Sequence, residues 1–279
     1  MTVHLLGAAE IRALAAELDV TPTKKLGQNF VVDANTVRKI VQVGAVGPTD
    51  RVVEIGPGLG SLTLAVLETG AHVVAVEIDH RLAARLAQTA AAHGVPEGAL
   101  TVIDADALQV TELPGEPSVL IANLPYNVSV PVLLHFMETF PHLQRGVVMV
   151  QAEVGERLAA PPGSKVYGAP SVKAAWYGTW RLAGTVSRQV FWPVPGVDSV
   201  LVGFHRDAVA RGTEEERRRT FRLVDAAFGQ RRKMLRQSLS AELGGTSAAA
   251  SVVLEAAGVA PTERGEQLTV DDFLRIARA

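Results

Sequence analysis

The sequence contains no cysteine among its 279 residues, and this absence excludes disulfide bonds and thiolate metal sites. Its seven histidines are scattered without an HxxH-type pair, so we expect no metal site. No apolar run reaches the roughly 18 residues that a membrane-spanning helix needs. No basic segment with a long apolar core opens the chain, so we expect no signal peptide. A soluble cytoplasmic protein is the plain expectation.

The chain also has little net charge, at −2, so its overall charge indicates no class of partner. The local balance differs, because nine Lys/Arg residues stand against four Asp/Glu residues between Arg211 and Arg236. A composition that is 48% hydrophobic, over this length, is enough for one large domain and a small one.

From residue 51 onward, apolar strand patterns alternate with helical patterns. Five strands are predicted, a buried one at 51–55 and further ones at 72–77, 100–104, 118–123 and 146–151. Continuous apolar runs that alternate with helices predict a parallel sheet covered on both faces. Two later strands are expected at 171–178 and 199–205, the second as an antiparallel edge.

The pattern changes after Asp207, where the chain becomes helical. Helices are predicted at 217–241, 248–257 and 270–277, and a short amphipathic helix at 11–18 precedes the α/β region. We therefore expect one domain over residues 1–207 and a second, helical domain over residues 208–279.

A glycine loop, in the letters VVEIGPGLGSLT, places Gly56, Gly58 and Gly60 between a predicted strand and a predicted helix. Glycine allows tight turns and close approach of a ligand to the backbone. A nicotinamide-dinucleotide fingerprint needs glycine where Ser61 stands, so this spacing does not suit a pyrophosphate. Glu77 ends the next strand about twenty residues later, where a carboxylate can accept both ribose hydroxyls. A glycine-rich turn without a ligand would not require Glu77. The glycine loop and Glu77 together therefore predict a binding site for S-adenosylmethionine.

Asp106 lies just after the third predicted strand, in the letters DADAL. A carboxylate at Asp106 could accept the exocyclic amine of the cofactor's adenine, and Asp104 is the alternative two residues earlier. Either residue could instead cap the N-terminus of a helix. For Asp104 we favour that capping role.

The letters ANLPYN close the fourth predicted strand, at the edge where α/β sheets bind ligands. The Asn123 side-chain oxygen and the Leu124 carbonyl can accept both hydrogens of an adenine amine, and Pro125 fixes the turn. Tyr126 offers a ring for an extruded base, although a strand-ending turn with a core tyrosine is the alternative. The methylated ammonium is acidic, so no strong general base is needed and we expect catalysis by positioning and electrostatics.

Eight motifs in order, from about Lys24 to the C-terminus, resemble the KsgA/RsmA ribosomal RNA adenine dimethyltransferases: KKLGQNFVVD, EIGPGLGSLT, VVAVEID, DAL, NLPYNVSVPVL, QAEVGERL, FWPVPGVDSV and FGQRRKMLRQSL. The resemblance implies a class I S-adenosylmethionine-dependent methyltransferase: an α/β, Rossmann-like fold with a mostly parallel seven-stranded sheet, then a small all-helical RNA-binding domain. It implies dimethylation at N6 of two adjacent adenosines in the 3′-terminal hairpin of 16S rRNA, with a role in small-subunit biogenesis. We expect a monomer without a membrane partner.

The resemblance also assigns roles to single residues. Its cofactor contacts fall on Asn29, Val31, Gly56, Gly58, Glu77, Asp106 and Asn123. Its target-base roles fall on residues 123–126 and on Phe191, for which core packing is the alternative. The family often has leucine at position 31, a mild change because the backbone makes that contact. It often has lysine where Ala152 stands, and this change removes a phosphate contact.

Four cations in the letters FGQRRKMLRQSL are expected to contact RNA: Arg231, Arg232, Lys233 and Arg236. Arg232 and Arg236 are four residues apart and would share a helical face, and no acidic run neutralises the cluster. By contrast, the arginines at 217–219 follow three glutamates, so we expect internal ion pairs at a solvated helix start there. Lys24 and Lys25 are further candidates for phosphate contact.

Three other functions agree less well with these motifs. The Erm group modifies large-subunit rRNA and shares the catalytic motifs, but FWPVPGVDS together with FGQRRKML favours the small-subunit enzymes. A non-catalytic RNA-binding relative is disfavoured by the intact ANLPYN and GPGLG motifs. A nicotinamide dehydrogenase is disfavoured by Ser61 and by the lack of a candidate acid or base for hydride transfer.

Overall fold

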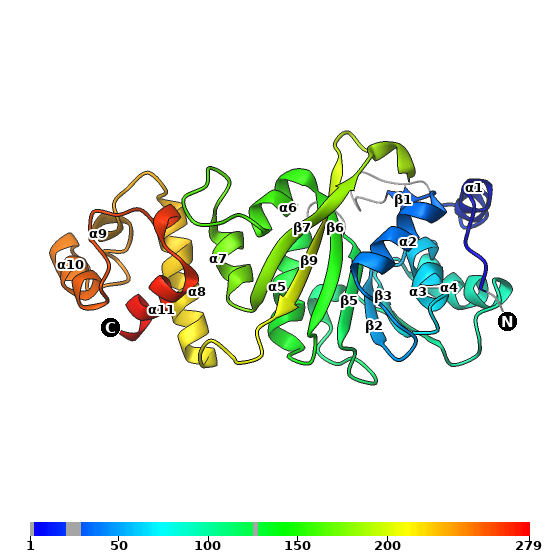
Figure 1. Cartoon of the computed structure of the whole chain (residues 1–279), viewed down its shortest axis with the longest axis horizontal. Coiled ribbons are helices and arrows are strands. Elements are labelled where there is room, and N and C mark those ends of the chain that lie inside the picture. The colour runs from blue at the N-terminus through cyan, green and yellow to red at the C-terminus, as the bar shows by residue number, and fades with distance from the viewer. Residues whose placement is uncertain (1–2, 21–28, 125–127) are drawn as a thin grey trace. The chain divides into compact units, whose positions relative to one another are not determined.

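The principal feature of the computed structural model, which describes residues 3–20, 29–124 and 128–279, is one large sheet (Figure 1). Its seven strands lie in the order β4-β3-β2-β5-β6-β9-β7. Their bounds are β2 (Arg51–Ile55), β3 (His72–Glu77), β4 (Leu100–Asp104), β5 (Val119–Asn123), β6 (Arg145–Gln151), β7 (Gly178–Val186) and β9 (Ser199–Arg206). β2 to β6 pair in parallel, whereas β9 runs antiparallel to β6.

Burial on both faces explains why the central strands are continuous apolar runs. In β2, Val52 and Val53 point to opposite faces, and both are fully buried. Register places Val52 beside Val73 of β3 and Val119 of β5. β-Branched side chains pack well on such a pleated, enclosed surface, so the sequence pattern and the observed strands agree.

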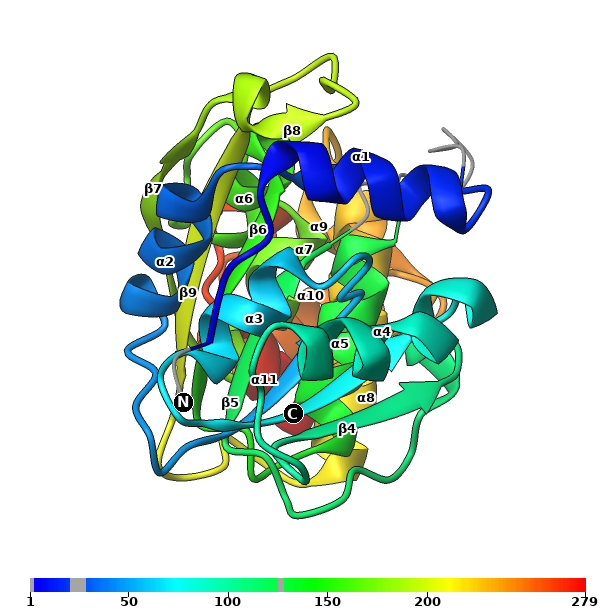
Figure 2. The ribbon, with the colours of Figure 1, turned by 90° about the vertical axis from the view of Figure 1, so that its right-hand side faces the viewer.

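Helices cover the two faces of this sheet (Figures 1 and 2). α2 (Ala34–Val43) and α3 (Ser61–Leu67) share a core cluster with one face, and α5 (Ser129–Thr139) packs on the other. α4 (His80–Ala92) lies beside β3 and β4. Asp33 and Asp79 cap α2 and α4 by accepting backbone N–H bonds, which fixes where these helices begin.

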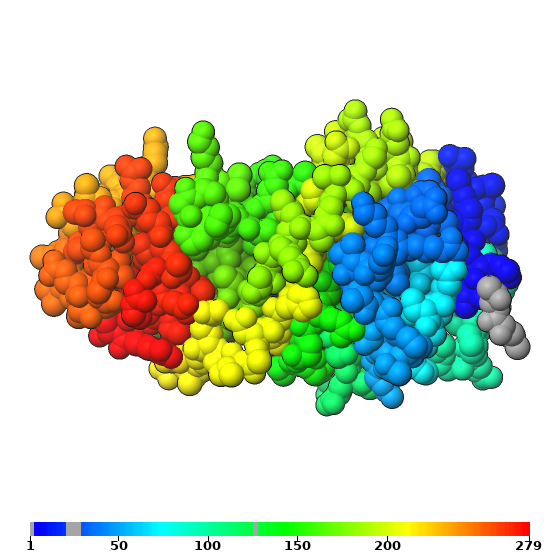
Figure 3. Space-filling model, in the orientation of Figure 1, coloured from blue at the N-terminus to red at the C-terminus, as the bar shows by residue number. Residues whose placement is uncertain are grey.

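The N-terminal segment packs beside α4 (Figure 3). Helix α1 (Ala8–Glu17) buries Ile11 and Ala15 in a cluster that also contains Leu82 of α4. The Arg81 guanidinium donates to the Asp19 carbonyl at 2.9 Å. These contacts confirm the predicted amphipathic helix and attach it beside α4.

A small two-stranded sheet joins segments that are far apart in the sequence. β1 (Phe30–Val31) pairs antiparallel with β8 (Phe191–Trp192), which follows the short 3-10 helix η2 (Arg188–Val190). Phe30 lies opposite Trp192, and Val31 lies opposite Phe191. Neighbouring residues of a strand point to opposite faces, so this register separates the two aromatic rings of FW.

The chain divides into two compact units, residues 1–155 with 181–206, and residues 156–180 with 207–279. One crossing between the units falls beside the boundary that we placed at residue 207. The segment 156–180 groups with the C-terminal helices, because Tyr167 donates to the Leu268 carbonyl at 2.8 Å and Lys173 pairs with Asp225 at 2.7 Å. The helical unit is therefore built from two stretches of chain.

The remaining helices lie mostly in this second unit. Their bounds are α6 (Ala152–Leu158), α7 (Ala169–Ala175), α8 (Glu214–Gly229), α9 (Leu235–Ser238), α10 (Ser247–Ala256), η3 (Gly265–Gln267) and α11 (Val270–Arg278). Within the unit, α11 packs against α8, which is the longest of these helices (Figure 1).

The predicted strand at 171–178 was wrong, because most of this segment forms helix α7. Pro170 lies in its first turn, where a missing N–H has no cost, and Ser171 accepts a hydrogen bond from the Gly168 N–H at 3.0 Å. Strand β7 follows the helix and occupies the sheet edge. β9 is therefore antiparallel, as predicted, but lies inside the sheet and not at its edge.

The predicted helix at 217–241 is also two helices, because α8 ends at Gly229 and α9 begins at Leu235. In α9, the backbone N–H groups of Leu235 and Arg236 bond to the carbonyls of Glu263 and Pro261, at 2.8 and 3.1 Å. The backbone between the helices thus turns toward a distant segment. No helix in the described ranges is long and apolar enough to cross a membrane.

Candidate active site at the carboxyl edge of the sheet

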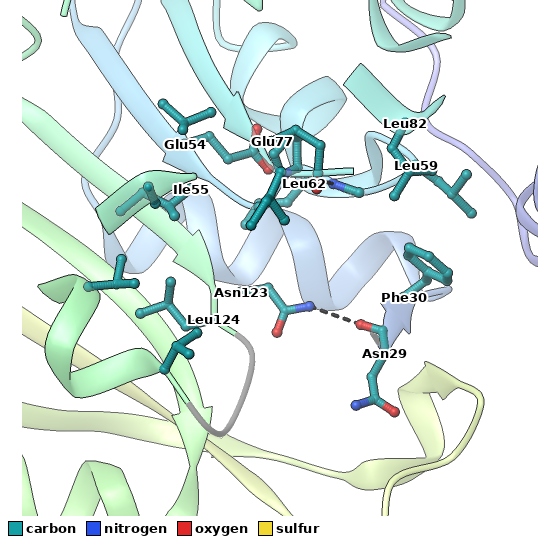
Figure 4. Close-up of a pocket in the computed structure, with 18 of the residues that line it drawn as sticks. Asn29, Phe30, Glu54, Ile55, Leu59, Leu62, Glu77, Leu82, Asn123 and Leu124 are labelled. Atoms are coloured by element: carbon teal, nitrogen blue, oxygen red, sulfur yellow. Dashed lines mark hydrogen bonds between the residues drawn. The ribbon is translucent and has the colours of Figure 1, made fainter. Parts of the chain in front are cut away.

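A cavity of about 320 Å³ lies where strands β2, β3 and β5 end (Figure 4). Residues from four strands, three α-helices and one short 3-10 helix line it, among them Asn29, Phe30, Glu54, Ile55, Leu59, Leu62, Glu77, Leu82, Asn123 and Leu124. Ligands of open α/β sheets bind at this edge, and the volume is within the roughly 300–1,000 Å³ typical of small-molecule sites. The cavity is therefore the candidate active site.

The glycine loop forms one wall of the cavity with its backbone. Gly58 has a φ of 58°, and a Cβ there would lie 3.0 Å from the Phe30 ring. Gly60 has a φ of 96° at the start of α3, and a Cβ there would lie 2.8 Å from a Leu86 methyl. Both positions require glycine for conformation and for space, so the loop brings bare main chain to the cavity.

Glu77 is the last residue of β3, and its carboxylate is held in place by backbone donors. The Gly58 N–H donates to Oε2 and the Asp79 N–H to Oε1, each at 2.9 Å. Burial raises the pKa of Glu77, and these two hydrogen bonds oppose the shift by stabilising the ionised form. The result is a fixed acceptor that lines the cavity next to the glycine loop.

Of the two aspartates at the end of β4, the structure brings only Asp106 to the cavity. Asp104 ends β4, is exposed, and forms an ion pair with His80. The capping role that we favoured for Asp104 belongs to Asp106, whose carboxylate accepts the Leu108 N–H at 2.9 Å at the start of η1 (Ala107–Gln109). The sequence alone did not show which of the two aspartates faces the cavity. If the strand ended one residue earlier or later, their roles would be exchanged.

Asn123 ends β5 and reaches across to the segment that precedes β1 (Figure 4). Its Nδ2 donates to the Asn29 carbonyl at 3.0 Å, which leaves Oδ1 turned away as an acceptor. Leu124 lines the cavity, and its N–H donates to the Met149 carbonyl at 3.0 Å. Asn29, Val31, Gly56 and Asn123 thus come together. Pro125 and Tyr126, also predicted to act here, lie outside the described residues, as do Lys24 and Lys25.

Phe191 is not brought into the cavity. Its ring is 2% exposed and belongs to the core cluster that also contains Val31. Trp192, on the opposite face of β8, stacks on the cavity residue Phe30 with a centroid distance of 6.3 Å. The structure thus gives Phe191 the core-packing role, since the strand register turns it inward.

Glu54 is the residue in this site that the sequence reasoning missed. It is 1% exposed, is the last but one residue of β2, and lines the cavity. Its Oε2 has no hydrogen-bond partner among the described residues, and neither has the buried Oγ of Ser61 nearby. Burial raises the pKa of Glu54 to about 8, the Thr63 hydroxyl opposes that shift, and the Glu77 carboxylate adds to it. An acidic residue inside the otherwise apolar run VVEI was the available signal.

The cations predicted to bind RNA differ in whether they form ion pairs within the protein. Arg231 donates to Glu266 at 2.7 Å and to the Lys165 carbonyl at 2.9 Å, so the expectation that no acid neutralises the cluster was wrong for this residue. Arg232, Lys233 and Arg236 are exposed, and no ion pair found in the described ranges involves them. Arg232 precedes α9, so it does not share a helical face with Arg236.

The internal ion pairs predicted at the start of α8 are present. Arg217 and Arg218 both bond to Glu214, at 2.8 and 2.6 Å, and these pairs hold the pKa of that carboxyl low, at about 2. Arg217 is buried, so its part of the helix start is not solvated as we expected. Among the described residues, no group of three or more His, Asp or Glu side chains could hold a metal ion.

Comparison with known proteins identifies the family of the chain. A family model described as Ribosomal RNA adenine dimethylase matches residues 21–279. A protein named Ribosomal RNA small subunit methyltransferase A from Leifsonia xyli subsp. xyli is 68% identical over 277 residues, covering 99% of this chain and 98% of that protein. Its namesake from Kineococcus radiotolerans is 60% identical, covering 98% of this chain and 91% of that protein.

Solved structures agree on the fold. A dimethyladenosine transferase from Plasmodium falciparum has a TM-score of 0.75 at 24% identity, covering 88% of this chain and 94% of that chain. The 23S rRNA methyltransferase ErmE has a TM-score of 0.67 at 25% identity, covering 90% of this chain and 98% of that chain. The fold is that of class I methyltransferases, with a mostly parallel seven-stranded sheet and a C-terminal helical region. On the family model and the near full-length relatives, the chain belongs to the ribosomal RNA adenine dimethylase family.

Proposed function

We propose that this protein uses S-adenosylmethionine to dimethylate N6 of two adjacent adenosines in the 3′-terminal hairpin of 16S rRNA. The observation that carries the proposal is the cavity, where Glu77, Asp106 and Asn123 lie at the ends of successive elements around a bare glycine loop. The two relatives compared above are named for the small ribosomal subunit, which supports 16S rRNA as the substrate.

The cavity fits a nucleoside that carries a cationic amino-acid end. The Glu77 carboxylate, fixed by two backbone N–H groups, can accept ribose hydroxyls, and Asp106 can accept an adenine amine. Two buried polar atoms, Glu54 Oε2 and Ser61 Oγ, have no hydrogen-bond partner among the residues described; they lie at the same cavity and gain partners from a polar ligand. When bound, S-adenosylmethionine supplies an electrophilic methyl group on a sulfonium.

The residues at the end of β5 would hold the target amine. Because Asn123 Nδ2 is engaged by the Asn29 carbonyl, its Oδ1 is oriented and can accept one N6 hydrogen. The Leu124 carbonyl would accept the other, and Tyr126 would stack on the extruded base. The N6 lone pair is conjugated into the adenine ring, so holding both N–H bonds favours the pyramidal nitrogen that attacks a methyl group. Such a site works by positioning and preorganised acceptors.

Phosphates of the rRNA would meet the exposed cations of the helical unit. Arg232, Lys233 and Arg236 are available for this, because no ion pair in the part of the chain that the structure describes engages them. Neutralising phosphates releases counterions, which supplies affinity that does not depend on sequence. Arg231 contributes differently, by tying the turn after α8 to Glu266.

The experiment is methylation of unmodified small ribosomal subunits with labelled S-adenosylmethionine, followed by primer extension to map the modified nucleotides. We expect label at two adjacent adenosines near the 3′ end of 16S rRNA. Intact large subunits and naked 23S rRNA serve as controls, because the ErmE neighbour is named as a 23S rRNA methyltransferase. Label in 23S rRNA alone would reject the small-subunit assignment and favour the Erm reaction.

We also propose that the protein acts as a monomer in the cytoplasm during small-subunit assembly. Light scattering after size-exclusion chromatography measures the mass of the particle directly. A mass near the 29.5 kDa of one chain is expected, and a stable dimer would reject the monomer.

A further inference from the structure

Glu54 is a buried acid that the proposed chemistry does not yet use. Its side chain is 1% exposed, and Oε2 makes no hydrogen bond to any residue in the described ranges. An ionised carboxylate in such a place is costly unless a cation or several donors compensate it. The neutral acid is therefore the stable form while the cavity is empty.

Within the ranges that the structure describes, no compensating cation comes from the elements packed around it. The neighbours in register are Ala75 of β3 and Ile121 of β5, and α3 carries no ionisable side chain. The charged group that acts on Glu54 is the Glu77 carboxylate, which opposes ionisation.

The other charged groups near this face do not offset Glu54 either. Arg38 of α2 is bonded to Glu68 at 2.8 Å, and the adjacent Lys39 is exposed, with its Nζ near Gly184. Asp106, the third acid of the cavity, adds negative charge. Among the described lining residues there is no Lys, Arg or His.

The strand order indicates which part of the methyl donor meets Glu54. β4 and β3 lie on one side of β2, with Asp106 and Glu77 after their ends, and β5 lies on the other side with Asn123. A nucleoside held at Glu77 leaves its amino-acid end over β2 and β5. That end carries an ammonium group, which is the cation that Glu54 lacks.

We propose that Glu54 holds a proton in the empty cavity and releases it when the amino-acid end of the methyl donor binds. This inference rests on the proposed function, since it takes S-adenosylmethionine as the donor. The carboxylic O–H bond breaks, the proton passes to water, and the carboxylate that remains pairs with the donor's ammonium group. No oxidant or further reactant is needed.

The electrostatics of the site agree with this assignment. Burial raises the pKa of Glu54 to about 8 in the empty protein. A cation brought within about 4–6 Å lowers the pKa of a carboxyl group. Between pH 6 and 7, the empty protein is thus mostly protonated at Glu54 and the complex is ionised. Glu54 is in this sense a positioning residue that recognises the cationic end.

The test is isothermal titration calorimetry of the full chain at pH 6.5, repeated in buffers of different ionisation enthalpy. At this pH an ordinary α-amino group, with a pKa of about 7.7–8.0, is already charged and takes up little proton. S-Adenosylmethionine is expected to release about one proton more than 5′-methylthioadenosine, which lacks the amino-acid end. The latter ligand reports any release caused by the nucleoside at Glu77. S-Adenosylhomocysteine, which keeps the amino-acid end without the sulfonium charge, should match S-adenosylmethionine.

The Glu54→Gln variant keeps the shape of the side chain and cannot ionise. It should abolish the difference in proton release, weaken S-adenosylmethionine at least about tenfold, and leave 5′-methylthioadenosine unchanged. Equal release by all three ligands in the wild-type protein would overturn the inference, whether or not the variant folds. Release with S-adenosylmethionine alone would overturn the amino-acid-end assignment. No binding of S-adenosylmethionine at all would instead reject the proposed function.

Discussion

Single residues of the cavity differ in what holds them, and Glu77 is the most firmly fixed. Glu77→Ala should weaken S-adenosylmethionine binding by roughly 1–3 kcal/mol, because charge-assisted bonds to ribose are lost. Calorimetry measures this, and the thermal unfolding midpoint should change little, since water in the cavity can reach the freed Gly58 and Asp79 N–H groups.

A matched control for this variant is Glu68→Ala. Glu68 is also a paired carboxylate, bonded to Arg38 on α2, but it is not among the cavity residues. The control should bind S-adenosylmethionine like the wild type. An unchanged dissociation constant in Glu77→Ala would remove Glu77 from the site.

Asn123 acts through an oriented amide oxygen. Asn123→Ala removes that acceptor and should lower single-turnover methyl transfer by about 10²–10³-fold, while binding to ribosomal particles is largely kept. Measured S-adenosylmethionine affinity separates a loss of chemistry from a loss of cofactor. Wild-type turnover would show that Asn123 only closes the strand through its bond to the Asn29 carbonyl.

The buried acid Glu54 also makes a prediction about stability. Its pKa is raised from 4.5 to about 8 on folding, so the native state binds more protons than the unfolded state between these values. Stability from this group is present at low pH and is lost as the pH rises, by on the order of 1.4 kcal/mol per pH unit. Urea unfolding from pH 5 to pH 8 should therefore show a flatter decline in Glu54→Gln than in the wild type. Parallel declines would contradict the raised pKa.

At the scale of elements, the turn between α8 and α9 carries two kinds of cation. Arg232 and Lys233 are exposed, whereas Arg231 forms an ion pair with Glu266. Replacing Arg232 and Lys233 together with Gln should weaken binding to small subunits and spare cofactor binding. Each lost phosphate contact should flatten the plot of log affinity against log salt by roughly 0.7–0.9 units. The variant should differ most from the wild type at low salt.

Arg231→Gln is the control variant for the double substitution of Arg232 and Lys233. It breaks the ion pair with Glu266 and the bond to the Lys165 carbonyl, so it should lower the stability of the helical unit. Such partly exposed pairs contribute at most about 1 kcal/mol. Its salt slope should match that of the wild type. An unchanged slope in the Arg232 and Lys233 double variant would mean that another surface binds the RNA.

At the scale of the whole molecule, the helical unit depends on two separate stretches of chain. Tyr167, Lys173 and Trp176 contact residues beyond 207, the last through an edge-on ring contact with Phe221 at 6.0 Å. A fragment of residues 208–279 lacks these partners and should show no cooperative thermal transition by circular dichroism. In the full chain, Tyr167→Phe should cost about 1 kcal/mol of stability through its lost hydrogen bond. Cooperative unfolding of the fragment would support an independent domain at 208–279.

Local pattern determined much of the fold and part of the site. The strands at 51–55 and 72–77 were predicted residue for residue, because strands buried on both faces are mostly apolar runs. The strand at 100–104 was also predicted with its observed bounds, although it is an edge strand without a buried residue. The positions of the glycine loop and of Glu77 were likewise predicted from the sequence. The distance between them in the chain is set by a strand, a tight turn and the next strand.

Other features depend on residues that are distant in the sequence, and only the tertiary structure decided them. Arg231 is neutralised by Glu266, and Phe191 turns inward because β8 pairs with β1 in one register. The lack of a cation beside Glu54, among the described residues, follows from what α3, β3 and β5 do not supply. Burial and partners of a polar side chain are set by packing between separate segments, and local composition does not contain that information.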